Sequence, residues 1–187
     1  MAVARKIMIL NGSPRMKGNT AMLCEAFSEG ARSAGHEITS FALQKMKIAG
    51  CTGCMKGGKN QLSPCIIKDD MEQIYPIYEA ADTVVLASPM YYWTISGQLK
   101  TAFDRLFAVA ECNPDYANPV KDCALLMAAE DASAENWTAI NAWYDNLLHF
   151  LKWKDLGRIL AGGVLDAGAI ADKAELKMAH DLGASLR

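Results

Sequence analysis

Short apolar runs alternate with longer stretches of helical periodicity along most of this chain. The runs predict five strands, at about residues 7–10, 37–43, 83–87, 123–128 and 157–164. Between them, apolar residues recur every three or four positions and predict helices at about residues 19–34, 70–81, 95–110, 137–151 and from 172 onward. Residues 44–69 lack clean periodicity and contain several glycines, which is typical of a functional or mobile segment.

This strict alternation predicts an α/β fold with a doubly wound, five-stranded parallel sheet in the order 2-1-3-4-5 and helices on both faces. We expect residues 1–187 to form a single domain, with 44–69 as an irregular, cysteine-containing insertion and a C-terminal helix within 166–187. Ligands of such sheets bind at the C-terminal ends of the first and third strands. The pattern therefore directs attention to the loops after Leu10 and Ala87.

Composition excludes several function classes. Of 187 residues, 51% are hydrophobic and 21% charged, which suits a globular core. The net charge of −2 suggests no polyanion-binding surface, so no nucleic-acid partner is expected. No apolar run approaches the roughly 18 residues that cross a bilayer, and the N-terminal apolar stretch is short for a signal peptide. We therefore expect a cytoplasmic protein with reduced thiols and no membrane partner.

The loop after the first predicted strand has the composition of an anion site. Residues 11–20 read NGSPRMKGNT, which matches neither an ATP P-loop nor a dinucleotide fingerprint. Glycines allow close approach of backbone N–H groups, and the following helix presents its N-terminus, so the loop suits one terminal phosphate. The composition alone fits an ordinary surface loop as well. The candidate ligands are Ser13, Arg15, Gly18, Asn19 and Thr20, and Lys17 is a second candidate for the positive charge.

The loop after the third predicted strand is aromatic. Residues 88–97 read SPMYYWTISG, and three consecutive aromatic residues after a central strand cannot all face a core. Exposed at the crevice, they would flank a flat, uncharged ring system. A hydrophobic lid or a subunit interface is the alternative. A phosphate loop beside an aromatic slot predicts a mononucleotide with a large flat ring.

GSPRMKGNT followed by SPMYYWTISGQLKTAFDRL resembles the NADPH-dependent FMN reductase family, which has a flavodoxin-like fold, in its branch close to the iron–sulfur flavoproteins. The resemblance covers about residues 6–165, including IKDDM after Cys65. It implies a non-covalent FMN whose phosphate is bound by Ser13, Arg15, Asn19 and Thr20. It also implies that the isoalloxazine ring lies beside Pro89, Met90, Tyr91, Tyr92 and Trp93.

The family's third flavin loop follows the fourth strand, here at Ala129 and Glu130. This loop has no obvious glycine, and a carboxylate near the flavin would disfavour an anionic reduced ring and lower the potential. The resemblance further implies a homodimer or homotetramer that accepts hydride from NAD(P)H and passes electrons to a quinone, flavin, metal or protein acceptor. The alternatives are an electron carrier without NAD(P)H turnover and a fold that has lost its cofactor. No catalytic side chain is expected, because the flavin carries the chemistry.

Three of the six cysteines, Cys51, Cys54 and Cys65, are spaced as C-x2-C-x10-C. A [4Fe–4S] cluster usually needs four thiolates, and structural zinc needs four nitrogen or sulfur ligands. The iron–sulfur flavoproteins carry C-x2-C-x2-C and a further cysteine, and this chain has Gly57 at the third position. We therefore expect loop thiols without a metal. A cluster with a substitute ligand, zinc with His36 or another partner, and a redox-active thiol remain alternatives.

Overall fold

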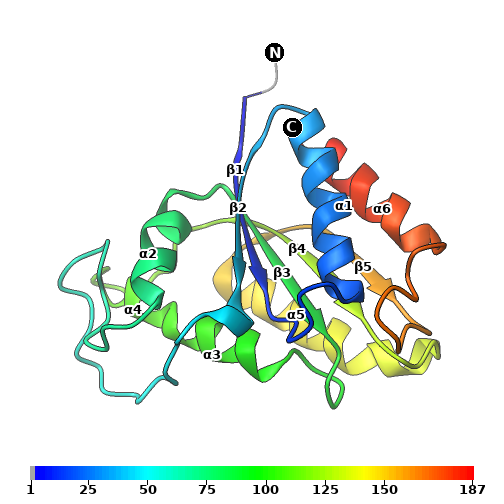
Figure 1. Cartoon of the computed structure of the whole chain (residues 1–187). Coiled ribbons are helices and arrows are strands. Elements are labelled where there is room, and N and C mark those ends of the chain that lie inside the picture. The colour runs from blue at the N-terminus through cyan, green and yellow to red at the C-terminus, as the bar shows by residue number, and fades with distance from the viewer. Residues whose placement is uncertain (1–2) are drawn as a thin grey trace.

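The predicted fold class is confirmed in the computed structural model, which describes residues 3–187 (Figure 1). All strand pairs are parallel, and the sheet order is β2-β1-β3-β4-β5. The strands are β1 (Lys6–Asn11), β2 (Glu37–Ala42), β3 (Thr83–Pro89), β4 (Asp122–Ala128) and β5 (Lys154–Ala161). The helices are α1 (Asn19–Ser33), α2 (Met71–Ala80), α3 (Gly97–Arg105), α4 (Phe107–Ala110), α5 (Thr138–Leu151) and α6 (Ala174–Ala184), with 3₁₀ helices at Leu43–Lys45 and Ala134–Trp137.

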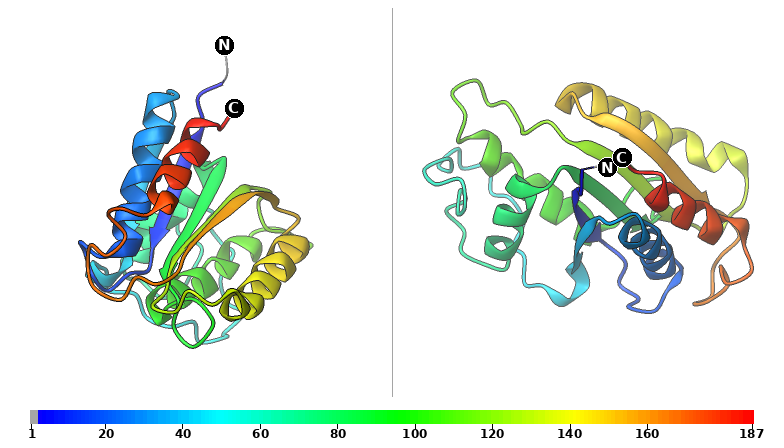
Figure 2. Two further views of the ribbon diagram at one scale, coloured as in Figure 1. Left: turned by 90° about the vertical axis from the view of Figure 1, so that its right-hand side faces the viewer. Right: turned by 90° about the horizontal axis from the view of Figure 1, so that it is seen from above.

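Helices cover both faces of the sheet, and each face has its own apolar core (Figure 2). Successive residues of each central strand alternate between these two cores. Met8 and Leu10 pack on the side of α2–α5, whereas Ile7 and Ile9 pack on the side of α1 and α6. Because both faces are covered, the central strands are apolar along almost their whole length. The sheet thereby fixes the positions of the loops that leave its C-terminal edge.

Helices α1 and α6 approach each other at backbone distance. A Cβ at Gly30 would overlap the carbonyl oxygen of His180, and a Cβ at Gly183 would overlap that of Phe27. Both positions therefore require glycine. This contact attaches the C-terminal helix to the helix that begins at the predicted anion loop.

Most predicted ranges agree with the structure to within two residues, and three elements need comment. The fifth strand is Lys154–Ala161 rather than 157–164, because Gly163 has a φ of +70° and turns the chain away from the sheet. The helix predicted at 95–110 is two helices, α3 and α4, although Ser96 caps the first as expected for this residue type. The last helix begins at Ala174, so residues 166–173 are a loop. The segment after β5 is thus free to line the ligand-binding edge.

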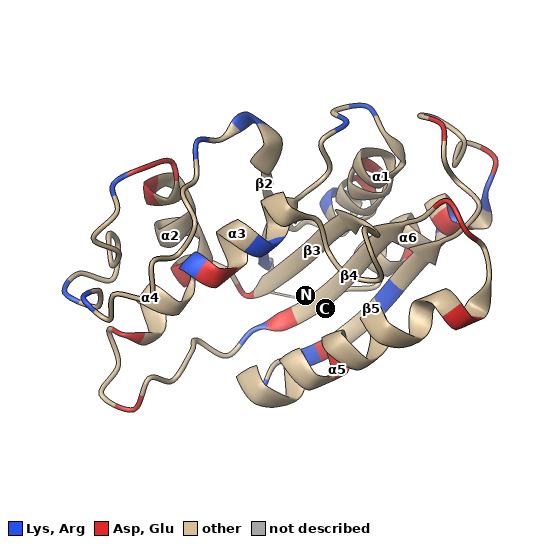
Figure 3. Ribbon diagram, turned by 90° about the horizontal axis from the view of Figure 1, so that it is seen from below, with Lys and Arg blue, Asp and Glu red and all other residues tan. Residues whose placement is uncertain are grey.

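The C-terminal edge of the sheet carries loops in which Lys and Arg are interspersed with Asp and Glu (Figure 3). It is here, at the ends of β1, β3, β4 and β5, that a cavity opens. No helix within residues 3–187 combines the length and apolarity needed to span a membrane.

Candidate functional site

A cavity of about 180 Å³ lies at the C-terminal ends of the strands. Its walls come from the loop after β1, the segment after β3, the end of β4 and the segment after β5. Every sequence-predicted site residue lines it except Tyr92 and Trp93. The two loops that the sequence singled out are therefore brought together around one space.

The N-terminus of α1 opens into this cavity without a side-chain cap. Gly18 is the N-cap residue in extended conformation, and no side chain bonds to the first-turn N–H groups. Since such groups carry the positive end of the helix dipole, they favour an anion. Arg15 adds a cation from the same loop, and its Nη1 donates to the carbonyl oxygen of Leu165 at 2.7 Å. The arrangement can bind a phosphate.

The anion loop is held in shape by its own polar groups. Ser13 N donates to Asn11 Oδ1 at 2.9 Å, and Arg15 N donates to Ser13 Oγ at 3.2 Å. A Cβ at Gly18 would lie 2.8 Å from the Cβ of Arg15, so a larger residue there would displace the arginine. The loop is therefore a defined cradle rather than a variable turn.

Asn19 lines the cavity, but its side chain is already used by the protein. Its Nδ2 donates to the carbonyl oxygens of Val164 and Asp166 at 3.0 and 2.9 Å. Its Oδ1 accepts from the backbone N–H groups of Gly168 and Ile170 at 3.0 and 3.3 Å. The side-chain amide is therefore an anchor for the loop after β5, and the backbone N–H of Asn19, in the first turn of α1, is the Asn19 donor left for an anion.

This anchored loop supplies two lining residues that the sequence analysis missed. Val164 and Leu165 line the cavity and belong to no predicted motif. The available signal was the glycine pair at 162–163, directly after an apolar strand that ends at the same sheet edge. Because the sequence analysis assigned Val164 to the fifth strand, it did not identify Val164 as a lining residue of the cavity.

The aromatic segment forms a tight turn with an unusual backbone. Tyr91 and Thr94 exchange two backbone hydrogen bonds of 3.0 and 3.1 Å around a two-residue turn. Tyr92 and Trp93 at its tip have φ values of +48° and +62°. Such a turn favours Asn-Gly, and bulky residues there cost roughly 1–3 kcal/mol each. The turn directs Tyr92, which is 94% exposed, away from the cavity and leaves Tyr91 on its wall.

Trp93 connects two walls of the site instead of lining the cavity. Its Nε1 donates to Asn136 Oδ1 at 2.8 Å, which ties the segment after β3 to the segment after β4. Nearby, the N–H of Met90 donates to the carbonyl oxygen of Ala128 at 2.8 Å. These bonds fix the spacing between the two loops expected to flank a flat ring.

Acidic groups occupy one rim. Glu130 is exposed and lines the cavity, as the sequence predicts for this loop. Hydrogen bonds from Ser133 to the neighbouring Asp131 hold the pKa of that carboxyl below its usual value. Two carboxyl groups, those of Glu130 and Asp131, therefore follow one another just after β4 at this rim.

The sequence profile of the NADPH-dependent FMN reductase family matches residues 5–153, most of the chain. This chain belongs to that family. The sheet order described above agrees with the flavodoxin-like fold of this family. The predicted resemblance, including the branch close to the iron–sulfur flavoproteins, is confirmed.

Individual relatives agree with this assignment. An iron–sulfur flavoprotein of Archaeoglobus fulgidus is 36% identical over 95 residues, which are 51% of this chain and 42% of the relative. The chain described here spans about half the length of the curated iron–sulfur flavoproteins that it matches. A putative NAD(P)H-dependent FMN-containing oxidoreductase of Bacillus subtilis is 22% identical over 95% of this chain and 96% of its own. The structure of an NAD(P)H:quinone oxidoreductase from Methanothermobacter marburgensis superposes with a TM-score of 0.78 at 18% identity, covering 99% and 97% of the two chains, and supports the fold.

The three loop cysteines surround a second cavity, which shares no lining residue with the first. Its volume is about 30 Å³, room for roughly one or two water molecules. An iron–sulfur cube contains four iron and four sulfide ions, so this space does not fit one. Among residues 3–187, no three His, Cys, Asp or Glu side chains converge on a common metal position. His36, a possible zinc ligand from the sequence, is buried elsewhere, accepting from Arg5 N and within 3.1 Å of the Leu186 carbonyl oxygen.

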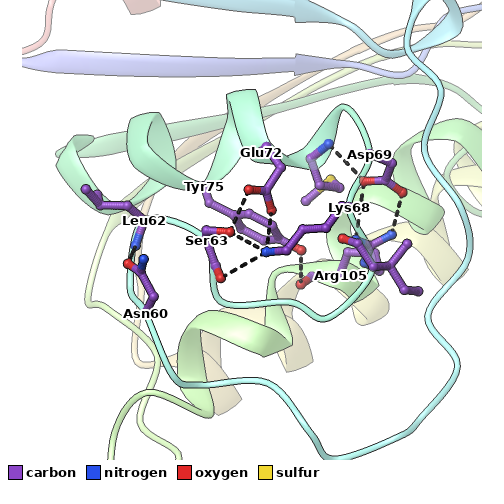
Figure 4. Close-up of polar contacts among 10 residues, drawn as sticks. Asn60, Leu62, Ser63, Lys68, Asp69, Glu72, Tyr75 and Arg105 are labelled. Atoms are coloured by element: carbon purple, nitrogen blue, oxygen red, sulfur yellow. Dashed lines mark hydrogen bonds and ion pairs between the residues drawn. The ribbon is translucent and has the colours of Figure 1, made fainter.

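Arg105 fixes the loop that carries these cysteines (Figure 4). The side chain is 1% exposed and donates to the carbonyl oxygens of Ala49 and Ile67 at 2.8 and 3.1 Å. It also pairs with Asp69 at 2.8 Å. Burial acts to raise the pKa of Asp69, but the hydrogen bonds from Arg105 and from backbone N–H groups outweigh it and hold that pKa below its usual value. Asp69 lies in the IKDDM motif and Arg105 in the motif after the third strand, but the sequence analysis did not pair them, because a buried ion pair between distant segments has no local pattern.

Proposed function

We propose that this protein is an FMN-dependent oxidoreductase that takes hydride from NAD(P)H and passes the electrons to a quinone, flavin, metal or protein acceptor. The observation that carries the proposal is one cavity joining an uncapped helix N-terminus and Arg15 to the Tyr91 wall. An anion site beside an apolar and aromatic wall matches the two ends of FMN. When bound, FMN would supply the redox chemistry.

The residues at the anion end would hold the phosphate. The first-turn N–H groups of α1 and the Arg15 guanidinium are donors there, and the Ser13 hydroxyl, which donates to the Arg15 carbonyl oxygen at 3.2 Å, would have to turn to join them. Hydrogen bonds that involve a charged group contribute roughly 1.5–3 kcal/mol each. The chain therefore has enough donors to retain a mononucleotide without a covalent bond.

The residues at the other end would position the ring and leave it accessible. Met90, Tyr91 and Ala129 line this part of the cavity, and the ring would have to stay accessible to NAD(P)H. Glu130 at the rim places negative charge near the ring, which opposes an anionic reduced state. No side chain is required to act as an acid or base in this scheme, so the protein's contribution is binding, orientation and electrostatic tuning.

A matched pair of variants tests the phosphate end. Arg15→Ala removes the cavity's cation, and Lys17→Ala removes an exposed cation from the same loop that does not line the cavity. We expect Arg15→Ala to weaken FMN binding by roughly 10- to 150-fold and Lys17→Ala to change it by less than about threefold. The penalty should be small for riboflavin, which lacks the phosphate. Equal losses in both variants, or equal losses for both ligands, would refute the assignment.

Turnover separates the proposal from an electron carrier. The FMN-loaded protein should oxidise NADH or NADPH in the steady state when a soluble quinone is added. A carrier without its own NAD(P)H turnover would show no oxidation above the rate of free FMN. The oligomeric state, a homodimer or homotetramer, remains a prediction that light scattering on the FMN-loaded protein tests. The cytoplasmic location also remains a prediction.

A further inference from the structure

The carboxylate of Glu111, at the end of α4, fills the space beside Gly57 in the cysteine loop. A Cβ at position 57 would overlap Glu111 Oε2 and lie 3.2 Å from its Cδ. It would also lie 2.9 Å from the carbonyl oxygen of Pro64. Because close-packed groups do not tolerate such overlap, position 57 has no room for a side chain while Glu111 keeps this conformation.

The backbone on both sides of this contact is held in place. Gly58 has a φ of +77°, and a Cβ there would overlap the main-chain carbonyl of Glu111. The N–H of Gly58 donates to Pro64 O at 3.0 Å, and the N–H of Glu111 donates to Phe107 O at 3.1 Å. The end of α4 therefore packs directly against the backbone of residues 57–58.

Position 57 is the place where a compact cluster-binding run would have its third ligand. The run C-x2-C-x2-C supplies three thiolates to one cluster, and Cys51 and Cys54 occupy its first two positions. Glu111 lines the cavity that these two cysteines share with Cys65. The Glu111 carboxylate thus lies in the space from which a third cysteine side chain would start.

We propose that Glu111 occupies the space that a cysteine at position 57 would need, so that this chain lacks both the third thiolate of a [4Fe–4S] run and the room for it. The three thiols stay free on a loop that Arg105 fixes against α3. This chain then differs from the iron–sulfur flavoproteins to which it is similar, and electrons leave it from the flavin cavity alone. That consequence rests on the proposed function, whereas the claim about Glu111 does not.

Anaerobic reconstitution with ferrous iron and sulfide tests the proposal in four proteins: the wild type, Gly57→Cys, Glu111→Ala and the double variant. Iron, acid-labile sulfide and FMN are measured in each sample, so a failure of the flavin assignment appears separately. We expect well under one iron per chain in the first three proteins and about four in the double variant. Uptake of about four iron ions by the wild type or by Gly57→Cys alone would overturn the proposal, as would a folded double variant without iron.

Thiol labelling of the wild type keeps the proposal testable if the double variant does not fold. Burial raises the pKa of Cys24 and Cys123 to about 12, so these two thiols are the unreactive internal standards. Cys51 is exposed and should be alkylated by iodoacetamide at the same rate before and after treatment with iron and sulfide. Protection of Cys51 by that treatment would contradict the proposal.

Discussion

Replacing Asn19 with alanine should loosen the loop after β5 and destabilise the protein measurably. The side chain is 6% exposed and makes four hydrogen bonds to the backbone of residues 164–170. Each bond contributes roughly 0.5–1.5 kcal/mol, and water will replace some of them where the loop is near the surface. We therefore expect the free energy of unfolding to fall by about 2–4 kcal/mol, which lowers the Tm by about 5–15 °C.

Urea unfolding followed by tryptophan fluorescence measures this change, and Asn146→Ala on the exposed face of α5 is the matched control. The control should stay within about 0.5 kcal/mol of the wild type. Asn19→Asp keeps the acceptor but directs a carboxylate at two carbonyl oxygens, so it should be at least as damaging as Asn19→Ala. FMN affinity should fall in both Asn19 variants, because Val164 and Leu165 lose their anchor. A destabilisation below about 0.5 kcal/mol in Asn19→Ala would refute the anchoring role.

Three further predictions follow from other parts of the structure. The pKa of Asp69 is lowered in the folded state. Its contribution to the free energy of unfolding is therefore present above the unfolded pKa of about 3.9 and is lost as the pH falls through the folded pKa. In acid unfolding titrations, Asp69→Asn should flatten the pH dependence of stability below about pH 4. Gly30→Ala should lower the free energy of unfolding by more than 1 kcal/mol, since its Cβ would overlap a carbonyl oxygen of α6. Glu130→Gln should raise the flavin midpoint potential in a spectroelectrochemical titration, and an unchanged potential would reject its electrostatic role.

Much of the fold was predictable from local pattern. The run TVVLA between Asp82 and Ser88 is apolar after its threonine, because β3 is buried on both faces. A strand of this kind can therefore be predicted from its continuous apolar residues. The two ligand loops were predictable for a related reason. In a doubly wound sheet, the topology brings the ends of β1 and β3 together, so two distant motifs specify one cavity.

What the sequence did not predict depends on side chains that satisfy distant backbone groups. Asn19 is a residue type that commonly binds phosphate, but its side-chain amide hydrogen-bonds to the backbone of a loop about 145 residues away in the sequence. Glu111 belongs to no motif, and only the packing of α4 places its carboxylate beside Gly57. The aromatic turn shows the same limit, because the positive φ values that turn Tyr92 away from the cavity are set by the hairpin rather than by residue preference.

The most direct test of the central claim is a calorimetric titration of the flavin-free protein with FMN and, separately, with riboflavin. The claim is that the uncapped N-terminus of α1 and Arg15 bind the phosphate of a flavin in the 180 Å³ cavity. We predict one FMN per chain and an affinity for FMN at least tenfold higher than for riboflavin, which corresponds to one charged hydrogen bond of about 1.5 kcal/mol. Equal affinity for the two flavins, or no binding of FMN, would contradict the account.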